Sequence, residues 1–272
     1  FFALKGNNFN GNAFALQALK LGAAYAVIDE DADETNNRLI KVDNVLDTLQ
    51  KLAKYHREQF KIPFIAITGS NGKTTTKELI GAVLSSHYKT YATEGNLNNH
   101  IGVPLTLLKI KTDAEMAVIE MGANHQKEIE FYCTIALPTH GIISNVGKAH
   151  LEGFGGIEGV RKGKGELYDF LRNHNGAAFA FDDYDYLHQM SKGIKEVVWY
   201  GTNNGEVRGN VTASKPFLEV AINKGVSFNT IKTNLVGDYN LPNILCAVTI
   251  GKYFNVPDEK IKLAIENYVP SN

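Results

Sequence analysis

The sequence predicts an α/β protein built on a doubly wound, mostly parallel sheet. Three observations support this fold class. Between residues 62 and 200, short apolar runs rich in β-formers alternate with longer segments that carry apolar residues at helical spacing. The first of these runs leads directly into a glycine-containing turn and a helix, as in phosphate-binding loops. Residues 1–41 show a strand–helix–strand pattern on a smaller scale, which predicts a small N-terminal α/β unit.

The N-terminal unit is predicted from short local patterns. In order we expect a strand, a Gly/Asn-rich loop, a helix, a second strand and an exposed polar loop, at 1–4, 5–12, 14–21, 24–28 and 29–38. Gly22 directly follows the apolar helical run and is the expected C-cap. The Gly/Asn-rich loop is either a ligand contact or a plain surface turn.

A longer helix connects this unit to the rest of the chain. Asp43 is its expected N-cap, apolar residues follow at helical spacing, and the helix runs to about Phe60. Pro63 interrupts the pattern and marks a boundary. We therefore predict a partial N-terminal domain with the connecting helix at 1–60, and a central domain at 61–272.

The central domain is expected to contain a parallel sheet with helices between most of its strands. These strands are predicted at 64–68, 89–92, 116–121, 141–146, 177–181 and 196–199. Three shorter alternating runs predict antiparallel hairpins, at 207–213, 217–221 and 226–233. A helix at 239–254, opened by Asp238, and a short helix that starts at Pro257 complete the domain.

The stretch Ile62–Ile80 combines a strand, the turn Gly69–Gly72 and a helix that begins at Lys73. Such a turn directs backbone N–H groups at an anion, and the helix dipole favours the negative charge of that anion. Lys73 is placed to reach the β- and γ-phosphates of a nucleotide, and the Thr74 hydroxyl to hold Mg²⁺. Ile67 stands where the usual P-loop has its first glycine, so the spacing is shortened. The alternative is an ordinary turn between a strand and a helix.

Ligands of a doubly wound sheet bind at the carboxyl ends of its strands, so the residues there are informative. Glu120 ends an apolar strand and suits Mg²⁺, with a helix cap as the alternative. The loop Thr93–Pro104 carries three asparagines and is either a polar binding loop or an Asn-rich turn. His150 follows another strand, but imidazole is a poor Mg²⁺ ligand, so a loop hydrogen bond is its simpler role.

Two further groups stand out in helices. Gly163 and Gly165 lie in a basic helical run, where each glycine costs ~1 kcal/mol relative to alanine. They indicate close approach of the backbone to another group, or else a frayed, solvated helix. Asn240 and Asn243 share a face at a helix start, where they are either ordinary caps or side chains that hydrogen-bond the edge of a purine.

Composition limits the possible functions. A hydrophobic content of 44% supports a real core, and a net charge of −1 gives no broad attraction for nucleic acid or an anionic membrane. No apolar run approaches the ~20 residues of a membrane span, and no secretory signal is visible. Cys133 and Cys246 lie in apolar runs, which favours a reducing compartment and gives no disulfide framework.

Several motifs together resemble the Mur ligase family. They are Thr68–Thr75, Gly95–Leu108, Glu120–His125, Ala149–Gly155, Lys164–Glu166 and Gly237–Asn243. The asparagine loop and Phe2–Gly6 are similar to the branch that adds D-alanyl-D-alanine to UDP-N-acetylmuramoyl-tripeptide. The sequence departs from the family at Tyr239, which replaces His, and at Lys127, which replaces the usual Gly. It also has Asn10-Gly-Asn12 where Asp-Gly-His is common.

The resemblance implies roles for individual residues. The ATP phosphates would be held by the loop residues Gly69, Ser70, Asn71, Gly72, Lys73, Thr74 and Thr75. Adenine would lie near Asn240 and Asn243, and the muramoyl-peptide would face Asn96, Asn98 and Asn99. Thr74 and Glu120 would bind Mg²⁺, with His150 and Lys164 at a second metal position. Carbamylation of Lys164 by CO₂ would turn a cation into an anionic oxygen ligand.

The resemblance also implies a reaction. ATP would activate a carboxylate of UDP-MurNAc-tripeptide as an acyl phosphate, and D-Ala-D-Ala would then form the amide, in bacterial cytoplasmic peptidoglycan synthesis. Lys73, Glu120, His150 and Lys164 would be the catalytic residues. The partners are therefore small molecules, without nucleic acid or membrane, and we expect a monomer.

Three alternative functions stay open. They are another Mur or folylpolyglutamate-type ligase, a nucleotide-binding module without turnover, and a simple P-loop hydrolase. We also expect this chain to be a fragment that lacks the start of a UDP-binding first domain and a third domain. On that view the chain alone would turn over little.

Overall fold

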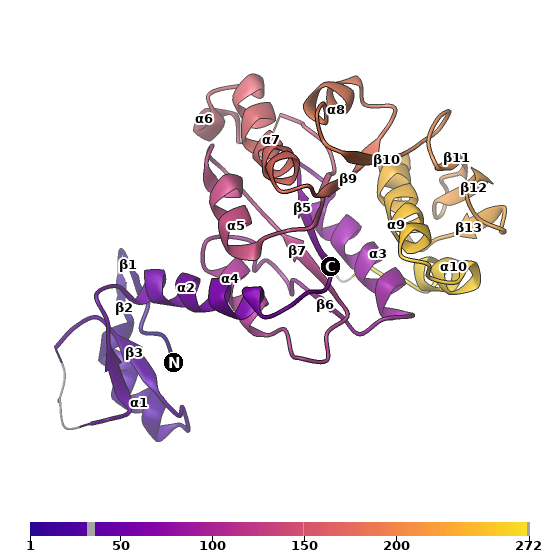
Figure 1. Cartoon of the computed structure of the whole chain (residues 1–272). Helices are drawn as coiled ribbons and strands as arrows, with labels where there is room; N and C mark the ends of the chain where they lie inside the picture. Colours follow the sequence, from indigo (N-terminus) through magenta and orange to yellow (C-terminus); the bar gives the residue numbers. More distant parts are fainter. Residues whose placement is uncertain (32–35, 149, 271–272) are drawn as a thin grey trace.

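The computed structural model describes residues 1–31, 36–148 and 150–270, and within these ranges a nine-stranded sheet is covered by helices on both faces (Figure 1). The strand order is β13-β12-β11-β10-β9-β8-β5-β7-β6. Every neighbouring pair from β6 to β11 is parallel, whereas β11, β12 and β13 pair antiparallel. The predicted doubly wound, mostly parallel sheet is confirmed, and the hairpins extend it because β11 pairs with β10.

The strands of this sheet lie close to their predicted positions. Their bounds are β5 (Phe64–Thr68), β6 (Thr90–Ala92), β7 (Met116–Glu120), β8 (His140–Ile143), β9 (Ala177–Phe181), β10 (Glu196–Gly201), β11 (Val207–Ala213), β12 (Glu219–Lys224) and β13 (Thr230–Lys232). Strand β8 ends at Ile143 rather than at Val146, because the next residues turn toward the phosphate loop.

The helices around the sheet are α3 (Lys73–Ser85), α4 (Gly102–Leu108), α5 (Glu128–Ala136), α6 (Leu151–Phe154), α7 (Ile157–Asn173), α8 (Asp185–Met190), α9 (Leu241–Tyr253) and α10 (Asp258–Glu266). The helix predicted from 239 begins later, because Asp238–Asn240 form a 3-10 turn, η2. Pro242 follows in the first turn of α9, where its missing N–H costs no helical bond. Helix α9 packs on α3, and α5 packs on α7.

The N-terminal unit contains short strands and two short helices. They are β1 (Lys5–Gly6), β2 (Phe9–Asn10), η1 (Gly11–Phe14), α1 (Ala15–Lys20), β3 (Ala26–Ile28) and β4 (Leu39–Lys41). The strand predicted at 1–4 is wrong: the segment makes an isolated parallel bridge from Phe2 to Val27. The observed C-cap of α1 is Leu21, one residue before the predicted Gly22, which follows it with a φ of 106° in the left-handed region that favours glycine.

Strand β4 pairs in parallel with β3 and was not predicted, because two of its three residues are exposed and show no alternation. The polar loop predicted before it falls partly on residues 32–35, which lie outside the described ranges.

Helix α2 (Val45–Glu58) joins the unit to the large sheet. Its predicted cap, Asp43, is wrong by one residue, because Asn44 accepts the N–H of Asp47 at 2.9 Å. Its buried side is formed by Val45, Leu49, Ala53 and Arg57, each four residues after the last. The Arg57 guanidinium donates at 2.7 Å to the carbonyls of Ala136 and Leu137, which ties α2 to the end of α5.

Buried apolar side chains form two separate clusters in the described part of the chain. Val45 belongs to the N-terminal cluster and Ala53 to the large one, so α2 is shared between them. This supports the division predicted at residue 60, which remains a prediction. Cys133 and Cys246 are buried and free, as expected.

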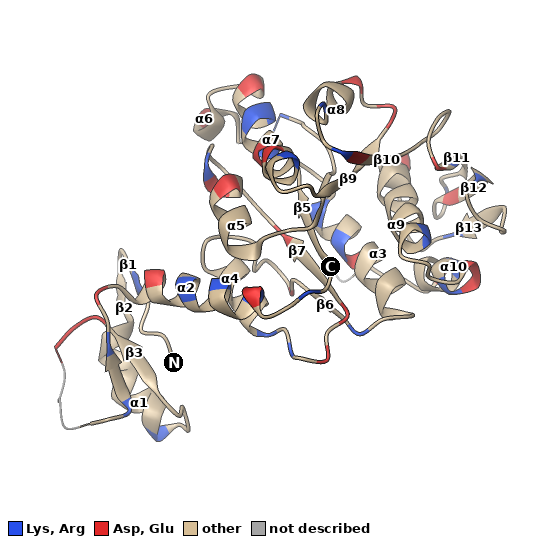
Figure 2. Ribbon diagram, viewed as in Figure 1, with Lys and Arg blue, Asp and Glu red and all other residues tan. Residues whose placement is uncertain are grey.

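Charged residues of both signs alternate along the helices and loops, in keeping with the net charge of −1 (Figure 2). None of the helices in the described ranges combines the length and apolar character needed to cross a membrane.

Candidate functional site

The phosphate loop lies between β5 and α3, where β5 is flanked by β7 and β8 (Figure 1). Gly69 and Gly72 have φ values of 145° and 77°, in the region that favours glycine. A Cβ at Gly69 would lie 2.1 Å from Ser144 Oγ. The loop therefore needs glycine at both ends, and the predicted turn between strand and helix is confirmed.

The loop at 144–147, after β8, clamps the phosphate loop. The N–H of Asn71 donates to Asn145 Oδ1 at 3.0 Å. The carbonyl of Asn71 accepts from Asn145 Nδ2 at 3.1 Å and from Ser144 Oγ at 2.6 Å. Gly147 N donates to Ser70 Oγ at 2.9 Å. The phosphate loop is therefore held before any ligand binds, which lowers the cost of ordering it.

Sequence reasoning missed Ser144 and Asn145. The available signal was a Ser-Asn pair directly after the buried strand β8, at the same sheet edge as the phosphate loop.

Lys73 folds over the phosphate loop. Its Nζ donates to the carbonyl of Gly69 at 2.9 Å and to that of Ser70 at 3.3 Å. Burial lowers the pKa of Lys73 below its usual value, and the nearby Glu120 carboxylate opposes this shift. The ammonium thus lies where it can donate to an anion held in the loop.

Glu120 ends β7 with a side chain that is only 1% exposed. Its Oε1 accepts from Asn98 Nδ2 at 2.8 Å and from Thr74 Oγ1 at 3.3 Å. Its Oε2 is buried and accepts no hydrogen bond within the described residues. A carboxylate and a hydroxyl are oxygen ligands that Mg²⁺ prefers, and a buried oxygen without a hydrogen-bond donor is one that a metal ion would satisfy. Thr74 and Glu120 therefore fit Mg²⁺.

His150 and Lys164 line the same cavity as Lys73. His150 has a φ of 53° at the start of α6, whereas Ala149 before it lies outside the described residues. Lys164 is buried, its Nζ donates to the carbonyl of Ala123 at 3.0 Å, and burial lowers its pKa to about 8. An ammonium cannot bind a cation, so unmodified Lys164 does not fit a metal. Where side chains are described, no three His, Cys, Asp or Glu residues gather as a metal site.

This cavity measures about 660 Å³ and gathers residues from distant segments. The predicted site residues that line it are Gly69, Lys73, Asn96, Asn98, Asn99, His150 and Lys164. His100, Asn124, Glu128 and Tyr132 line it as well and were not predicted. Asn99 also has a structural role, because its Oδ1 accepts from the N–H groups of Ile101 and Gly102 at the start of α4. The asparagine loop is thus both a turn and part of the cavity wall.

Asn240 and Asn243 are buried beside the phosphate loop and paired with protein groups. Asn243 Nδ2 donates to Asn240 Oδ1 at 2.9 Å, and Asn240 Nδ2 donates to Val236 O at 3.0 Å. Thr76 Oγ1 donates to Asn243 Oδ1 at 3.0 Å, which joins α3 to α9. Their position near adenine stays a prediction.

Close packing explains one of the two glycines, Gly163 and Gly165, in the basic helical run. A Cβ at Gly163 would lie 2.4 Å from Phe154 Cε1, whereas a Cβ at Gly165 would lie 3.5 Å from its nearest neighbour, Met190 Cε. The helix is not frayed there, since Gly163, Lys164 and Glu166 are buried. The close approach predicted from the glycines is therefore contact between α6 and α7 at Gly163.

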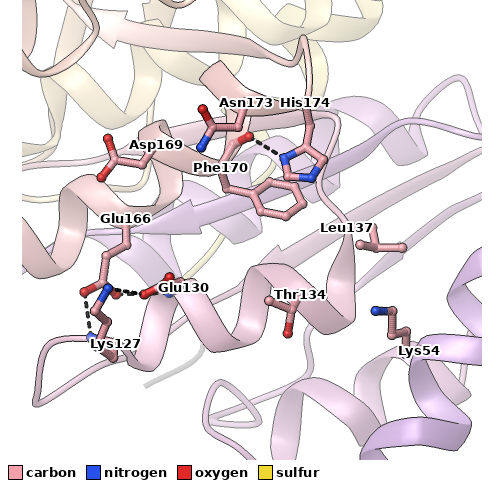
Figure 3. A pocket seen from close by; sticks show the side chains of 10 residues that line it. All are labelled: Lys54, Lys127, Glu130, Thr134, Leu137, Glu166, Asp169, Phe170, Asn173 and His174. Carbon is pink, nitrogen blue, oxygen red and sulfur yellow. Dashed lines mark hydrogen bonds and ion pairs between the residues drawn. The ribbon is translucent and has the colours of Figure 1, made fainter.

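Another cavity, of about 370 Å³, lies among α2, α5 and α7 (Figure 3). At its edge Glu166 accepts the N–H groups of Lys127 at 2.6 Å and Glu130 at 3.0 Å, and so caps α5 (Figure 3). Lys127 has a φ of 73°, a conformation that favours glycine. This explains physically why Gly is usual at that position in the family that the sequence resembles.

The sheet, the phosphate loop and the carboxylate at the end of β7 together define a P-loop α/β domain. Residues 67–251 match the model of the Mur ligase middle domain, and the chain belongs to the Mur ligase family. The predicted family is thus confirmed.

Two relatives within the family carry the same name. The UDP-N-acetylmuramoyl-tripeptide–D-alanyl-D-alanine ligase of Bacillus subtilis (strain 168) is 35% identical over 261 residues, which are 95% of this chain and 56% of that protein. The ligase of the same name from Escherichia coli (strain K12) is 34% identical over 271 residues, covering 98% of this chain and 60% of that protein. The chain thus spans 56% and 60% of the length of these two relatives.

Two solved MurF structures resemble this chain over its whole length. MurF from Acinetobacter baumannii superposes with a TM-score of 0.89 at 31% identity, covering 100% of this chain and 60% of that one. The MurF ligase of Thermotoga maritima in complex with ADP gives a TM-score of 0.86 at 27% identity, covering 100% and 63%.

Proposed function

We propose that this protein is an ATP-dependent ligase that joins D-Ala-D-Ala to UDP-MurNAc-tripeptide in bacterial peptidoglycan synthesis. The observation that carries the proposal is the position of Glu120, whose Oε1 accepts from Thr74 Oγ1 beside the preformed phosphate loop and whose buried Oε2 has no hydrogen-bond donor within the described residues. The shared name of the relatives and the ADP complex of a MurF structure support it. We infer that the reaction is cytoplasmic, where ATP is available.

The ATP half of the site is built from the phosphate loop. Within the loop Gly69–Thr75, the N–H groups of Ser70 and Asn71 already donate to Asn145, so the remaining N–H groups, chiefly at the α3 N-terminus, would hold the phosphates. Lys73 would release its bonds to Gly69 O and Ser70 O to reach the phosphates. Thr74 and Glu120 would hold Mg²⁺, which would neutralise charge on the transferring phosphoryl group. Adenine would lie toward Asn240 and Asn243.

The part of the site that would bind the muramoyl-peptide carboxylate is built from the asparagine loop and α7. Asn96, Asn98 and Asn99 would face the muramoyl-peptide across the cavity from Lys73. Residues 1–60 would contribute to binding the UDP end. Lys164, whose pKa is lowered to about 8, would be a neutral amine more often than an exposed lysine and thus open to carbamylation by CO₂. We assign His150 and carbamylated Lys164 to a second metal position.

The bond changes need no covalent enzyme intermediate. A carboxylate oxygen of the tripeptide attacks the γ-phosphorus, the bond to the β-phosphate oxygen breaks, and ADP leaves. The amine of D-Ala-D-Ala then attacks the acyl carbon of the acyl phosphate, phosphate departs with the bonding electrons, and the nitrogen releases one proton to solvent as the amide forms. The protein contributes position and positive charge, chiefly through the loop N–H groups and Lys73.

Phosphate release tests this proposal. The full-length protein would be assayed with ATP, Mg²⁺, UDP-MurNAc-tripeptide and D-Ala-D-Ala, leaving out one component at a time. We expect release only when both peptide substrates are present. ATP turnover indifferent to both would indicate a P-loop hydrolase, and nucleotide binding without any turnover would indicate a binding module.

A further inference from the structure

Lys77 is a buried cation with no part in the chemistry above. It lies one helical turn after Lys73 on α3, and its side chain is only 3% exposed. Its Nζ lies 3.7 Å from Glu120 Oε2 and 4.0 Å from Glu78 Oε1. Lysine is almost never buried this deeply unless it is paired, because removing its charge from water is costly.

Of its two carboxylate neighbours, Glu120 is the nearer and the more deeply buried. Glu78 is 27% exposed and already accepts the hydroxyl proton of Tyr268. Glu120 is 1% exposed, and its Oε2 has no hydrogen-bond donor within the described residues. The ammonium of Lys77 therefore forms an ion pair with that oxygen in this α3–β7 contact.

The two oxygens of Glu120 are held differently. Oε1 is fixed by hydrogen bonds from Asn98 and Thr74, whereas Oε2 faces Lys77 at 3.7 Å, beyond hydrogen-bond range. A Coulombic attraction at this distance orients the carboxylate yet leaves the Oε2 lone pairs free for another ligand.

We propose that Lys77 is a positioning residue that holds Glu120 in the orientation in which Oε2 can bind Mg²⁺. The inference rests on the metal site of the proposed function. Without the Lys77 charge, the carboxylate loses its anchor at Oε2 and turns toward the Lys73 ammonium, which it already influences. Both groups would then be drawn away from the Mg²⁺–nucleotide complex.

The test is the Mg²⁺ dependence of nucleotide binding, measured by titrating MgCl₂ into protein with a fluorescent ATP analogue. Lys77→Met removes the charge and keeps most of the side-chain length, Lys77→Arg keeps the charge, and Glu78→Gln removes the charge of the other carboxylate neighbour. We expect Lys77→Met to raise the half-saturating Mg²⁺ concentration by roughly 10- to 100-fold, as for loss of a residue that orients a metal ligand. Binding in EDTA would stay close to wild type, and Lys77→Arg and Glu78→Gln would retain most of the Mg²⁺ dependence.

A folded Lys77→Met variant with unchanged Mg²⁺ dependence would overturn the inference. If Lys77→Met does not fold, Lys77→Gln gives the same comparison. Loss of Mg²⁺ dependence in Glu78→Gln but not in Lys77→Arg would overturn the inference as well, because the effect would then belong to Glu78. The Glu120→Gln variant distinguishes failure of the proposed metal site from failure of the proposed role of Lys77. If wild type itself shows no Mg²⁺ dependence, the proposed metal site fails. If Glu120→Gln loses the dependence and Lys77→Met keeps it, only the role of Lys77 fails.

Discussion

The side-chain amide of Asn145 binds the backbone of Asn71 on both sides, accepting its N–H at 3.0 Å and donating to its carbonyl at 3.1 Å. Asn71 is in the middle of the phosphate loop, and Asn145 comes from the loop after β8. One amide thus fixes the two peptide groups on either side of Asn71, in a loop whose other N–H groups must point at an anion.

Asn145→Ala should therefore weaken nucleotide binding. Each lost hydrogen bond is worth about 1 kcal/mol, so we expect the Kd of a fluorescent ATP analogue to rise roughly tenfold or more. Asn145→Asp keeps the acceptor and loses the donor, so its Kd should lie between the Kd of wild type and that of Asn145→Ala. Unchanged affinity in a folded Asn145→Ala protein would mean that the loop orders without this clamp.

Gly163 and Gly165 of α7 should respond to alanine in opposite directions. Gly165→Ala meets its nearest neighbour at 3.5 Å, so higher helix propensity should stabilise the fold by up to about 1 kcal/mol. Gly163→Ala meets Phe154 Cε1 at 2.4 Å and should destabilise the fold by about 1–3 kcal/mol. Urea unfolding of both variants measures the difference, and equal effects would contradict the packing described for α6 and α7.

Lys127→Gly should stabilise the protein. The lysine has a φ of 73°, and this left-handed conformation costs a side chain about 1–2 kcal/mol. The ion pair lost with Glu130 is exposed to solvent, so its loss offsets little of this gain. Lys127→Ala is the matched control, because it loses the same ion pair and keeps the strain. A thermal melt should rank glycine above wild type and alanine below it; alanine equal to glycine would show that the backbone is unstrained.

His140 should make stability fall in mild acid. Burial against aromatic rings lowers the pKa of His140 from 6.5 to about 4. Between these values the unfolded chain binds a proton that the folded protein does not, so the free energy of unfolding falls as the pH drops from 6.5 toward 4. The loss attributable to this group is on the order of 2–3 kcal/mol.

Urea unfolding across that pH range, compared with His140→Gln, isolates this contribution because the other titrating groups are common to both proteins. Parallel pH profiles for the two proteins would show that His140 is protonated equally in the folded and unfolded states.

Patterns that are contiguous in the chain predicted most of the fold. Strands such as β5 and β9 were predicted at their observed bounds, because an apolar run between turn signals specifies a buried strand locally. Short and half-exposed elements were missed or shifted. Strand β4 shows no alternation, and the cap of α2 is Asn44 although Asp43 is equally suitable as a residue type.

Local sequence patterns are enough to specify the fold class, the family and the residues of the phosphate loop, since strand, turn and helix there follow one another within a single stretch. The side chains that complete the site depend instead on tertiary packing: Asn145 on Asn71, Lys77 against Glu120, and Asn243 on Thr76. Each of these pairs joins segments far apart in the chain, brought together by parallel strands that end at one sheet edge and by helices packed behind them. The register that sets such contacts depends on how whole elements pack, and no local pattern records it.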